Sequence, residues 1–427
     1  MSKSFLIVLA FGLCAGLFAC ANDEFYPDDE EGDGGYFEDV GEPNENDLSD
    51  EEPRPVEDEE ELAVLIAPAS DLSSSPNTTS SDRLVEAYTV FIEDAMQAKK
   101  IPGVAVAVIH GNDVIMARGF GWRNVDEQLP VTAETLFHIG STNKSMTAMA
   151  IASLVDEGVF DWDTPVADIY PGFKLAEATD TVTLRHLLSM RGGIPDSAED
   201  DFDVDNGTAE DLFTYVANIE LLDAPGEEFS YSNISASLSG FVGGNVYDEQ
   251  AESLYDSYIT LLQERVLDPI GMKNAVVRYS EAQQNPNYGK SYLLDRGEIV
   301  EAEPEDFDGD PFAPSGTLKA DVTEMALYIS TQLNRGAAPN GTQVVSEKNM
   351  AEMWQPYLEN YAMGWEVSTV QGAKVISHEG SFDNYLSVIG FVPELDLGFV
   401  ILMNSADTGE ELVIEGPKFL ISQVLSE

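Results

Sequence analysis

The chain has 427 residues and a formal net charge of −57, with 78 Asp and Glu against 21 Lys and Arg. So large a negative excess argues against binding to nucleic acid or to anionic lipid, because both need basic side chains to neutralise phosphate. The hydrophobic fraction of 43 % is ordinary for a globular protein and is enough to build a large core.

Residues 1–20 have the pattern of an export signal. Lys3 supplies a positive start, and residues 5–19 form an apolar core that is short for a membrane span. The run Leu17-Phe18-Ala19-Cys20 resembles the lipobox of a bacterial lipoprotein signal peptide, in which the cysteine is lipidated and becomes the new N-terminus. We therefore predict a lipid anchor on Cys20 and a place in the bacterial cell envelope, on the periplasmic side or at the cell surface. An ordinary secretory signal is the alternative, and the protein would then be secreted.

Residues 21–80 have the composition of an acidic, disordered linker. They are rich in Asp, Glu, Pro, Gly and Ser, and 20 acidic residues lie between Asp23 and Glu61. Such a segment buries too little apolar surface to order itself, and its like charges repel one another. Its predicted role is to hold a catalytic domain, residues 81–427, away from a membrane. A partner-binding acidic motif is the alternative.

Hydrophobic periodicity predicts a domain in which helices separate two groups of strands. The first helix, over residues 83–100, would be capped by Ser81 or Asp82. In chain order the other predicted elements are a β-hairpin at 103–110 and 113–122, a helix at 141–157, helical segments at 182–190, 211–219, 233–247 and 258–267, a helix at 322–336, strands at 374–380, 385–394 and 397–405, and a last helix at 415–425. The expected fold is α/β, with an antiparallel sheet flanked by the N- and C-terminal helices and an inserted, mostly helical lobe at about residues 141–285.

Ser141 and Lys144 are three residues apart at the start of the helix predicted at 141–157. Residues at this spacing share a helix face, so both side chains would point into one cleft. A serine hydroxyl needs a nearby base to act as a nucleophile, and burial at a helix N-terminus favours the neutral, basic form of a lysine amine. The pair alone is weak evidence, because a lysine at such a position is more often a solvated surface residue.

Two further motifs supply groups of the kind such a site requires. Tyr231 and Asn233 follow a Pro-Gly turn, and we expect the lysine to lower the pKa of the Tyr231 phenol so that it exchanges a proton with Ser141. Asn233 would hold the lysine and a substrate amide. Each residue by itself is more often a packing residue.

The third motif is predicted to end a strand. It comprises His378, Gly380 and Ser381. We expect His378 to bond the Tyr231 hydroxyl, Gly380 to admit the substrate to the strand edge, and the Ser381 N–H to join that of Ser141 as an oxyanion donor. A lone histidine at a strand end is usually structural.

The three motifs occur in the order SxxK, YxN and HxG, at 141–144, 231–233 and 378–380. In this the sequence resembles the serine β-lactamase and penicillin-binding-protein superfamily over residues 82–425, and most of all its class C branch, which includes D-peptidases and family VIII esterases. The resemblance implies a β-lactamase/transpeptidase-like fold, acylation of Ser141, and proton transfer to Lys144 alone or together with Tyr231. It implies no metal or organic cofactor.

The third motif departs from the KTG of the β-lactamases in two positions. His378 replaces the lysine, and Glu379 stands where relatives have a hydroxyl that binds a substrate carboxylate. If Glu379 faces the cleft, it would repel that carboxylate, so an ester or a neutral amide is favoured over a β-lactam as the small-molecule or peptide substrate. Two other classes stay open: a weakly catalytic penicillin-binding or peptidoglycan-sensing lipoprotein, and a surface protein with a vestigial site.

Overall fold

The computed structural model describes residues 79–111 and 113–426. The predicted signal peptide with Cys20 and almost all of the predicted linker lie outside the described residues. None of the helices in the described ranges combines the length and the apolar content that a membrane crossing needs.

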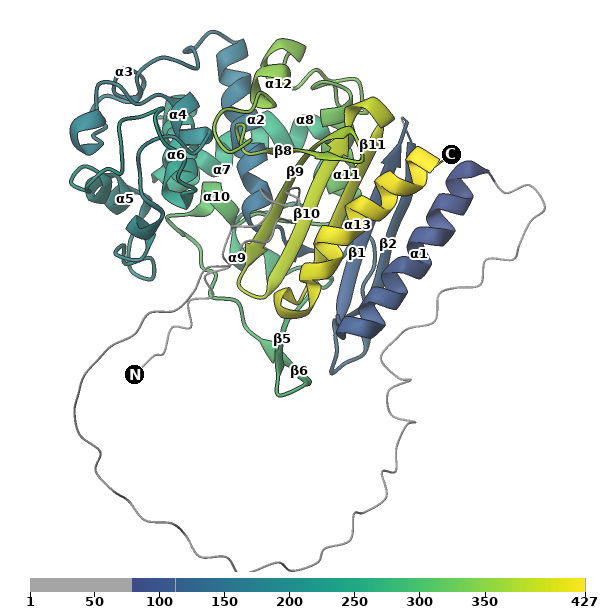
Figure 1. Ribbon diagram of the computed structural model, residues 1–427. Helices are drawn as coiled ribbons and strands as arrows, with labels where there is room; N and C mark the ends of the chain where they lie inside the picture. The colour runs from purple at the N-terminus through teal and green to yellow at the C-terminus, as the bar shows by residue number, and fades with distance from the viewer. Residues whose placement is uncertain (1–78, 112, 427) are drawn as a thin grey trace, which may run out of the picture. The chain divides into compact units, whose positions relative to one another are not determined.

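The centre of the domain is a seven-stranded antiparallel sheet (Figure 1). Its strands are β1 (Gly103–His110), β2 (Asp113–Asn124), β3 (Leu129–Pro130), β8 (Glu366–Val370), β9 (Ala373–Phe382), β10 (Tyr385–Val392) and β11 (Leu397–Met403), in the order β3-β2-β1-β11-β10-β9-β8. The first strand therefore pairs with the last, in a register that runs from Val104 opposite Met403 to His110 opposite Leu397.

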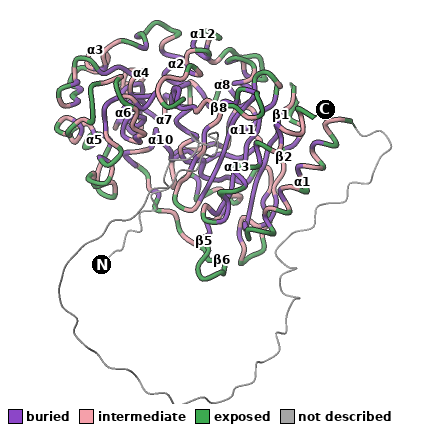
Figure 2. The backbone as a smooth tube through the Cα atoms, in the orientation of Figure 1, coloured by how far each residue is buried: buried purple, intermediate pink, exposed green. Residues whose placement is uncertain are grey.

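The sheet is apolar on both faces because both faces are covered. In β1, Val104, Val106 and Val108 belong to one core cluster. Ala105 and Ala107, which alternate with them, belong to a second cluster on the opposite face. Strands buried in this way read as continuous hydrophobic runs rather than alternating ones. Figure 2 shows the central strands β1, β10 and β11 buried along most of their length.

One face of the sheet is covered by α1 (Ser80–Lys99) and α13 (Ala406–Ser426), the first and last helices, as expected. Their packing includes stacked rings of Phe91 and Phe419, with centroids 4.6 Å apart. The cap of α1 is Thr79, which forms a capping box with Asp82, so the expected cap at Ser81 or Asp82 was wrong.

The last helix also differs from the prediction, because α13 begins nine residues before Glu415. Glycines and Pro417 make this segment a poor helix by propensity, and packing of Leu412 and Val413 on the sheet overrides that weakness.

The opposite face meets α11 (Val322–Leu333) and the helical lobe. At the centre of the lobe is α2 (Asn143–Asp156), which is buried nearly all round, and α6 (Asn233–Tyr247) packs beside it. The other helices of the lobe are α3 (Val166–Ile169), α4 (Leu184–Leu188), α5 (Ala209–Val216), α7 (Leu254–Leu262), α8 (Asp268–Ile270) and α9 (Tyr279–Ala282). The predicted fold class, with its inserted helical lobe, is confirmed.

Several short elements were missed. They are β4 (Phe137–His138) paired with β7 (Lys319–Ala320), the exposed hairpin β5 (Ser291–Asp295) and β6 (Glu298–Ala302), the edge strand β8, α10 (Ala313–Gly316) and α12 (Glu347–Met353). A two-residue strand has no periodicity to detect, and a polar edge strand resembles a loop in sequence.

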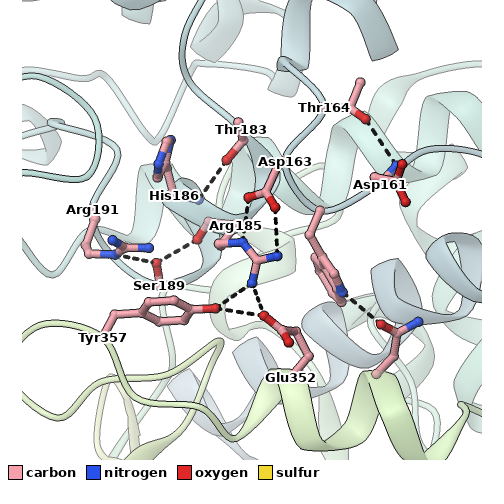
Figure 3. Close-up of polar contacts among 12 residues, drawn as sticks. Asp161, Asp163, Thr164, Thr183, Arg185, His186, Ser189, Arg191, Glu352 and Tyr357 are labelled. Carbon is pink, nitrogen blue, oxygen red and sulfur yellow. Dashed lines mark hydrogen bonds and ion pairs between the residues drawn. The ribbon is translucent and has the colours of Figure 1, made fainter.

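Arg185, on α4 of the helical lobe, connects the lobe to α12 and to Tyr357, which follows α12 (Figure 3). Its guanidinium donates to both carboxylate oxygens of Asp163, at 2.6 and 3.1 Å, and also to Glu352 on α12 and to the hydroxyl of Tyr357. The side chain is only 16 % exposed. A planar fork of donors suits this set of acceptors in a way that an ammonium group does not.

Substituting Arg185→Lys is therefore expected to lower the free energy of unfolding by about 1–3 kcal/mol, because several charged hydrogen bonds lose their donor. Denaturant unfolding measures the change. The control is Arg296→Lys, whose side chain is 92 % exposed and should be nearly neutral. Equal stability changes in the two variants would contradict the role given to Arg185.

Candidate active site

Ser141 lies in a 3-10 turn, Gly140–Thr142, that leads into α2. The regular helix therefore starts two residues later than predicted, yet Lys144 still follows one turn after the serine and on the same side. Ser141 is partly exposed, whereas Lys144 is 1 % exposed. Ser141 is therefore partly open to solvent, whereas the amine that contacts it is buried.

Three oxygen atoms surround the Lys144 amine. Its Nζ lies 2.9 Å from Ser141 Oγ, 2.6 Å from Asn233 Oδ1 and 3.0 Å from the carbonyl oxygen of Ser315. The last two oxygens are acceptors only, so they take two N–H donors. A neutral amine has two N–H bonds and one lone pair. In that state its lone pair is left for the Ser141 hydroxyl, which is the arrangement that a base for this serine requires.

Burial also favours the neutral state of Lys144. It lowers the pKa of the amine to about 7, against the opposing effect of the Glu199 carboxylate. A lysine on the surface would be almost fully charged at neutral pH. The alternative that Lys144 is a solvated surface residue is therefore excluded.

Tyr231 lies beside Ser141 and Lys144 as predicted, but the predicted lowering of its pKa was wrong. Its phenol is hydrogen-bonded to Ser141, and its ring centroid is 4.9 Å from Lys144 Nζ. The hydroxyl is buried, and this burial raises the pKa of Tyr231 instead of lowering it. The phenol is therefore neutral near pH 7.

His378 is close to Tyr231, but its two ring nitrogens contact other groups than the Tyr231 hydroxyl that we expected. The ring centroids are 6.2 Å apart, and His378 Nε2 instead lies 2.9 Å from the hydroxyl of Tyr361. On the other side of the ring, Nδ1 bonds the carbonyl oxygen of Glu379, which can only accept, so Nδ1 carries the proton. Burial lowers the pKa of His378 to about 3, so the ring is neutral. Tyr361 is thus the residue that holds His378, and His378 packs behind the Tyr231 ring.

The backbone of β9 passes directly beside Ser141. A Cβ on Gly380 would lie 2.2 Å from the carbonyl oxygen of Ile139 and 3.1 Å from Ser141 N. A Cβ on Gly140, which has φ of +53°, would lie 2.6 Å from Ser381 N. The two glycines therefore let the segments that carry the Ser141 and Ser381 amides approach each other, as a two-donor oxyanion site requires.

Substituting Gly380→Ala is expected to lower kcat by at least about a hundredfold, because the new methyl group displaces the Ser141 segment from the β9 edge. Steady-state kinetics and thermal unfolding should be measured together. Gly390→Ala is the matched control, since its Cβ would crowd Phe399 and Ser377 within the same sheet, away from the Ser141 segment. If both variants lose stability equally and both keep their kcat, the close approach is only a packing feature.

Glu379 points away from the catalytic pair. In β9, His378 and Gly380 face Tyr361 and the Ser141 segment, and residues alternate along a strand. The charges that act on Glu379 include Glu410 and Lys418, both from α13 on the other face of the sheet, and Glu366 from β8. The expected repulsion of a substrate carboxylate by Glu379 inside the cleft therefore has no support. No hydroxyl is present at this position either.

Three contact residues escaped the sequence analysis. They are Tyr361, Ser315, whose carbonyl oxygen bonds Lys144, and Glu199, which bonds Asn233. Tyr361 begins the run Tyr-Ala-Met-Gly-Trp, so a motif search had a signal for it. A backbone carbonyl and a carboxylate in an acidic loop have none. Among residues 79–111 and 113–426, no group of three or more His, Cys, Asp or Glu is placed to hold a metal ion.

A partly exposed serine that meets a buried lysine amine beside an antiparallel sheet defines the β-lactamase/transpeptidase-like class of proteins. In agreement, residues 90–417 match the family described as Beta-lactamase, and the chain belongs to this family. The resemblance predicted from the three motifs is thus confirmed. Members of the family are generally serine hydrolases.

Known relatives and structures are similar over most of the chain. Protein flp of Staphylococcus aureus (strain MW2) is 28 % identical over 318 residues, which are 73 % of this chain and 61 % of flp, so the chain spans about three fifths of that relative. The octameric penicillin-binding protein homologue from Pyrococcus abyssi is 28 % identical with a TM-score of 0.66, covering 78 % of this chain and 77 % of its own. A class C β-lactamase from Rhodobacter sphaeroides, 22 % identical, has a TM-score of 0.64 over 80 % of this chain and 99 % of its own, which indicates a shared fold.

Proposed function

We propose that the protein is a serine hydrolase that cleaves an ester or an amide through a covalent acyl-enzyme on Ser141. The contact that most directly supports this proposal is the 2.9 Å approach of the Lys144 amine to the Ser141 hydroxyl, with two carbonyl oxygens as further acceptors around the same nitrogen. A serine and a base in hydrogen-bonding contact are the starting point of nucleophilic catalysis.

In the acylation step, Ser141 Oγ bonds to the substrate carbonyl carbon while its proton passes to Lys144 Nζ. The negative charge on the carbonyl oxygen is taken up by the N–H groups of Ser141 and Ser381. The tetrahedral intermediate then collapses, the bond to the leaving group breaks, and Lys144 returns the proton to that group. The neutral Tyr231 phenol, hydrogen-bonded to Ser141, orients the hydroxyl and can pass this proton on.

In the deacylation step, water takes the place of the serine hydroxyl. The water oxygen attacks the ester carbon, its proton passes to Lys144, and the same two N–H groups hold the oxyanion. Collapse breaks the bond to Ser141 Oγ, which recovers the proton from Lys144 and leaves the free acid. Lys144 is therefore proton acceptor and donor in turn, a role suited to a group whose pKa is about 7.

For the substrate, we propose an acyl group without a carboxylate beside the scissile bond. His378 is neutral where the β-lactamases have a lysine, and Glu379 offers no hydroxyl. The net charge of −57 adds a general penalty for anionic substrates. These features favour esters and neutral or D-amino-acid amides over β-lactams.

The test is a substrate panel of p-nitrophenyl butyrate, nitrocefin and a D-alanyl dipeptide, with intact-mass detection of the acyl-enzyme and Ser141→Ala as the blank. We expect ester cleavage above the blank and slow nitrocefin turnover. Fast nitrocefin turnover with negligible ester cleavage would reverse the substrate ranking. An unmodified Ser141 with every substrate would refute the acyl-enzyme.

A second candidate is a weakly catalytic penicillin-binding or peptidoglycan-sensing lipoprotein. It is favoured by the 28 % identity to a penicillin-binding protein homologue and by the predicted lipobox. A fluorescent penicillin that stays on Ser141 for hours would support this receptor function, whereas release within minutes would support turnover.

For location, we propose export to the bacterial cell envelope and attachment through a lipid on Cys20. A signal-like start and a cysteine in a lipobox-like run support it. The substitution Cys20→Ala should release the protein from the membrane fraction. Unchanged membrane association would refute the anchor.

A further inference from the structure

Glu199 ends a 3-10 turn, Asp196–Glu199, in the loop that follows α4, far in sequence from the catalytic serine. Its carboxylate reaches the N-terminus of α6. One oxygen accepts from the backbone N–H of Asn233, and the other accepts from Asn233 Nδ2 at 2.8 Å. The N–H of Ile234 is a further donor. None of the three motifs contains this residue.

These bonds fix the orientation of the Asn233 side chain. An amide has one donor end and one acceptor end, and a carboxylate can bond only the donor end. With Nδ2 held by Glu199, Oδ1 is turned toward Lys144, whose Nζ lies 2.6 Å away. Glu199 is thus connected to Ser141 through Asn233 and Lys144 by an unbroken series of hydrogen bonds.

We propose that Glu199 is a positioning residue of the hydrolase: it holds Asn233 so that the Lys144 lone pair faces Ser141, and its negative charge sets the pH range in which Lys144 accepts a proton. This inference rests on the proposed function, because it concerns the base of that reaction.

The charges around Lys144 agree with this role. Titratable side chains approach it from three elements: Glu199 from the 3-10 turn, Tyr231 from the segment before α6, and His378 from β9. Burial keeps the last two neutral near pH 7, since it raises the pKa of Tyr231 and lowers that of His378. Burial raises the pKa of Glu199 as well, but its hydrogen bonds from Asn233 and Ile234 and the charge of Lys144 oppose that effect and favour the carboxylate. As a carboxylate, Glu199 raises the pKa of Lys144 against burial.

A purely structural role is the competing explanation. A carboxylate at a helix N-terminus stabilises the helix by accepting from its free N–H groups. Removing such a cap would lower stability, but it would not move the pH dependence of chemistry at Ser141. The two roles therefore differ in what happens to the pH profile.

The experiment measures how fast a fluorophosphonate probe labels Ser141 between pH 5 and 9, by intact mass, in the full chain. We expect Glu199→Gln to move the acidic limb of the rate to lower pH by about one unit, because loss of the anion makes the Lys144 ammonium less stable. Glu199→Asp, which keeps the charge, should leave the limb near its wild-type position. If Glu199→Gln does not fold, Glu199→Ala can be measured instead, and its acidic limb should move to lower pH by the same amount.

The matched control is Glu210→Gln. Glu210 also accepts from the first N–H of a helix, that of Leu254 on α7 at 2.9 Å, and it is not in contact with Lys144. It should lose some stability and keep the wild-type limb. If the acidic limb of Glu199→Gln does not move and its labelling rate falls equally at every pH, the inference about Glu199 is wrong, whereas the proposed hydrolase function is unaffected. A wild-type Ser141 that is unlabelled at every pH would instead refute the proposed function, and the inference with it.

Discussion

Replacing Ser141 with alanine is expected to reduce kcat at least about a thousandfold on any ester or amide that the protein hydrolyses, with no acyl-enzyme detectable. The hydroxyl is the atom that bonds the substrate, and no other side chain at this place can take over that bond. Ser141 is partly exposed and lies in a 3-10 turn, so the loss of one oxygen leaves no buried void. The melting temperature should therefore change little.

Kinetics, intact mass and thermal unfolding together check this prediction. Ser153→Ala is the matched control. Ser153 lies on α2, the helix that follows Ser141, and its Oγ donates to the carbonyl of Ala150 and accepts from Arg265, away from the site. The control variant should keep full turnover and lose some stability. Residual hydrolysis in Ser141→Ala at the wild-type rate would mean that another group is the nucleophile.

Much of the fold could be predicted because its signals are local. The apolar run at 103–110 coincides with β1, and the buried residues Leu84, Tyr88, Ile92 and Met96 give α1 its helical period. The elements that were predicted wrongly or missed depend on contacts between residues far apart in sequence. The start of α13 is set by packing on a sheet that forms from both ends of the chain, and β8 is defined as a strand by its pairing with β9.

The site follows the same division. Ser141 and Lys144 could be related from spacing alone, since one helical turn separates them. The protonation states of Lys144 and Tyr231 could not be predicted without the structure. A nearby positive charge lowers the pKa of a phenol and burial raises it, so the extent of burial decides which effect is larger. Glu199, at the end of a 3-10 turn, bonds Asn233, and the Ser315 carbonyl, on α10, bonds Lys144. Both residues lie far in sequence from Lys144 and outside the three motifs.

The pH dependence of the hydrolase is expected to follow Lys144. Its amine accepts the serine proton only when neutral, and its pKa is lowered to about 7 by burial. The value of kcat/KM should therefore fall as the pH drops below about 7, tenfold per unit once the ammonium dominates, and should level off above it. A profile measured from pH 5 to 9 checks this. His378 and Tyr231 should add no further change to the profile in this range, because burial lowers the pKa of His378 and raises that of Tyr231.

Lys144→Arg is the sharper form of the same prediction, because a guanidinium keeps its charge at any pH at which the protein is folded. The variant should lose at least about a thousandfold in kcat, and no rise in pH should restore it, whereas an amine whose pKa had merely been raised would recover its activity at high pH. Lys348→Arg, at an exposed position on α12, is the control and should match the wild type. If Lys144→Arg stayed active with an unchanged limb, the amine would be a positive charge rather than a base. The proton would then have to pass to the Tyr231 phenol, whose burial opposes its ionisation.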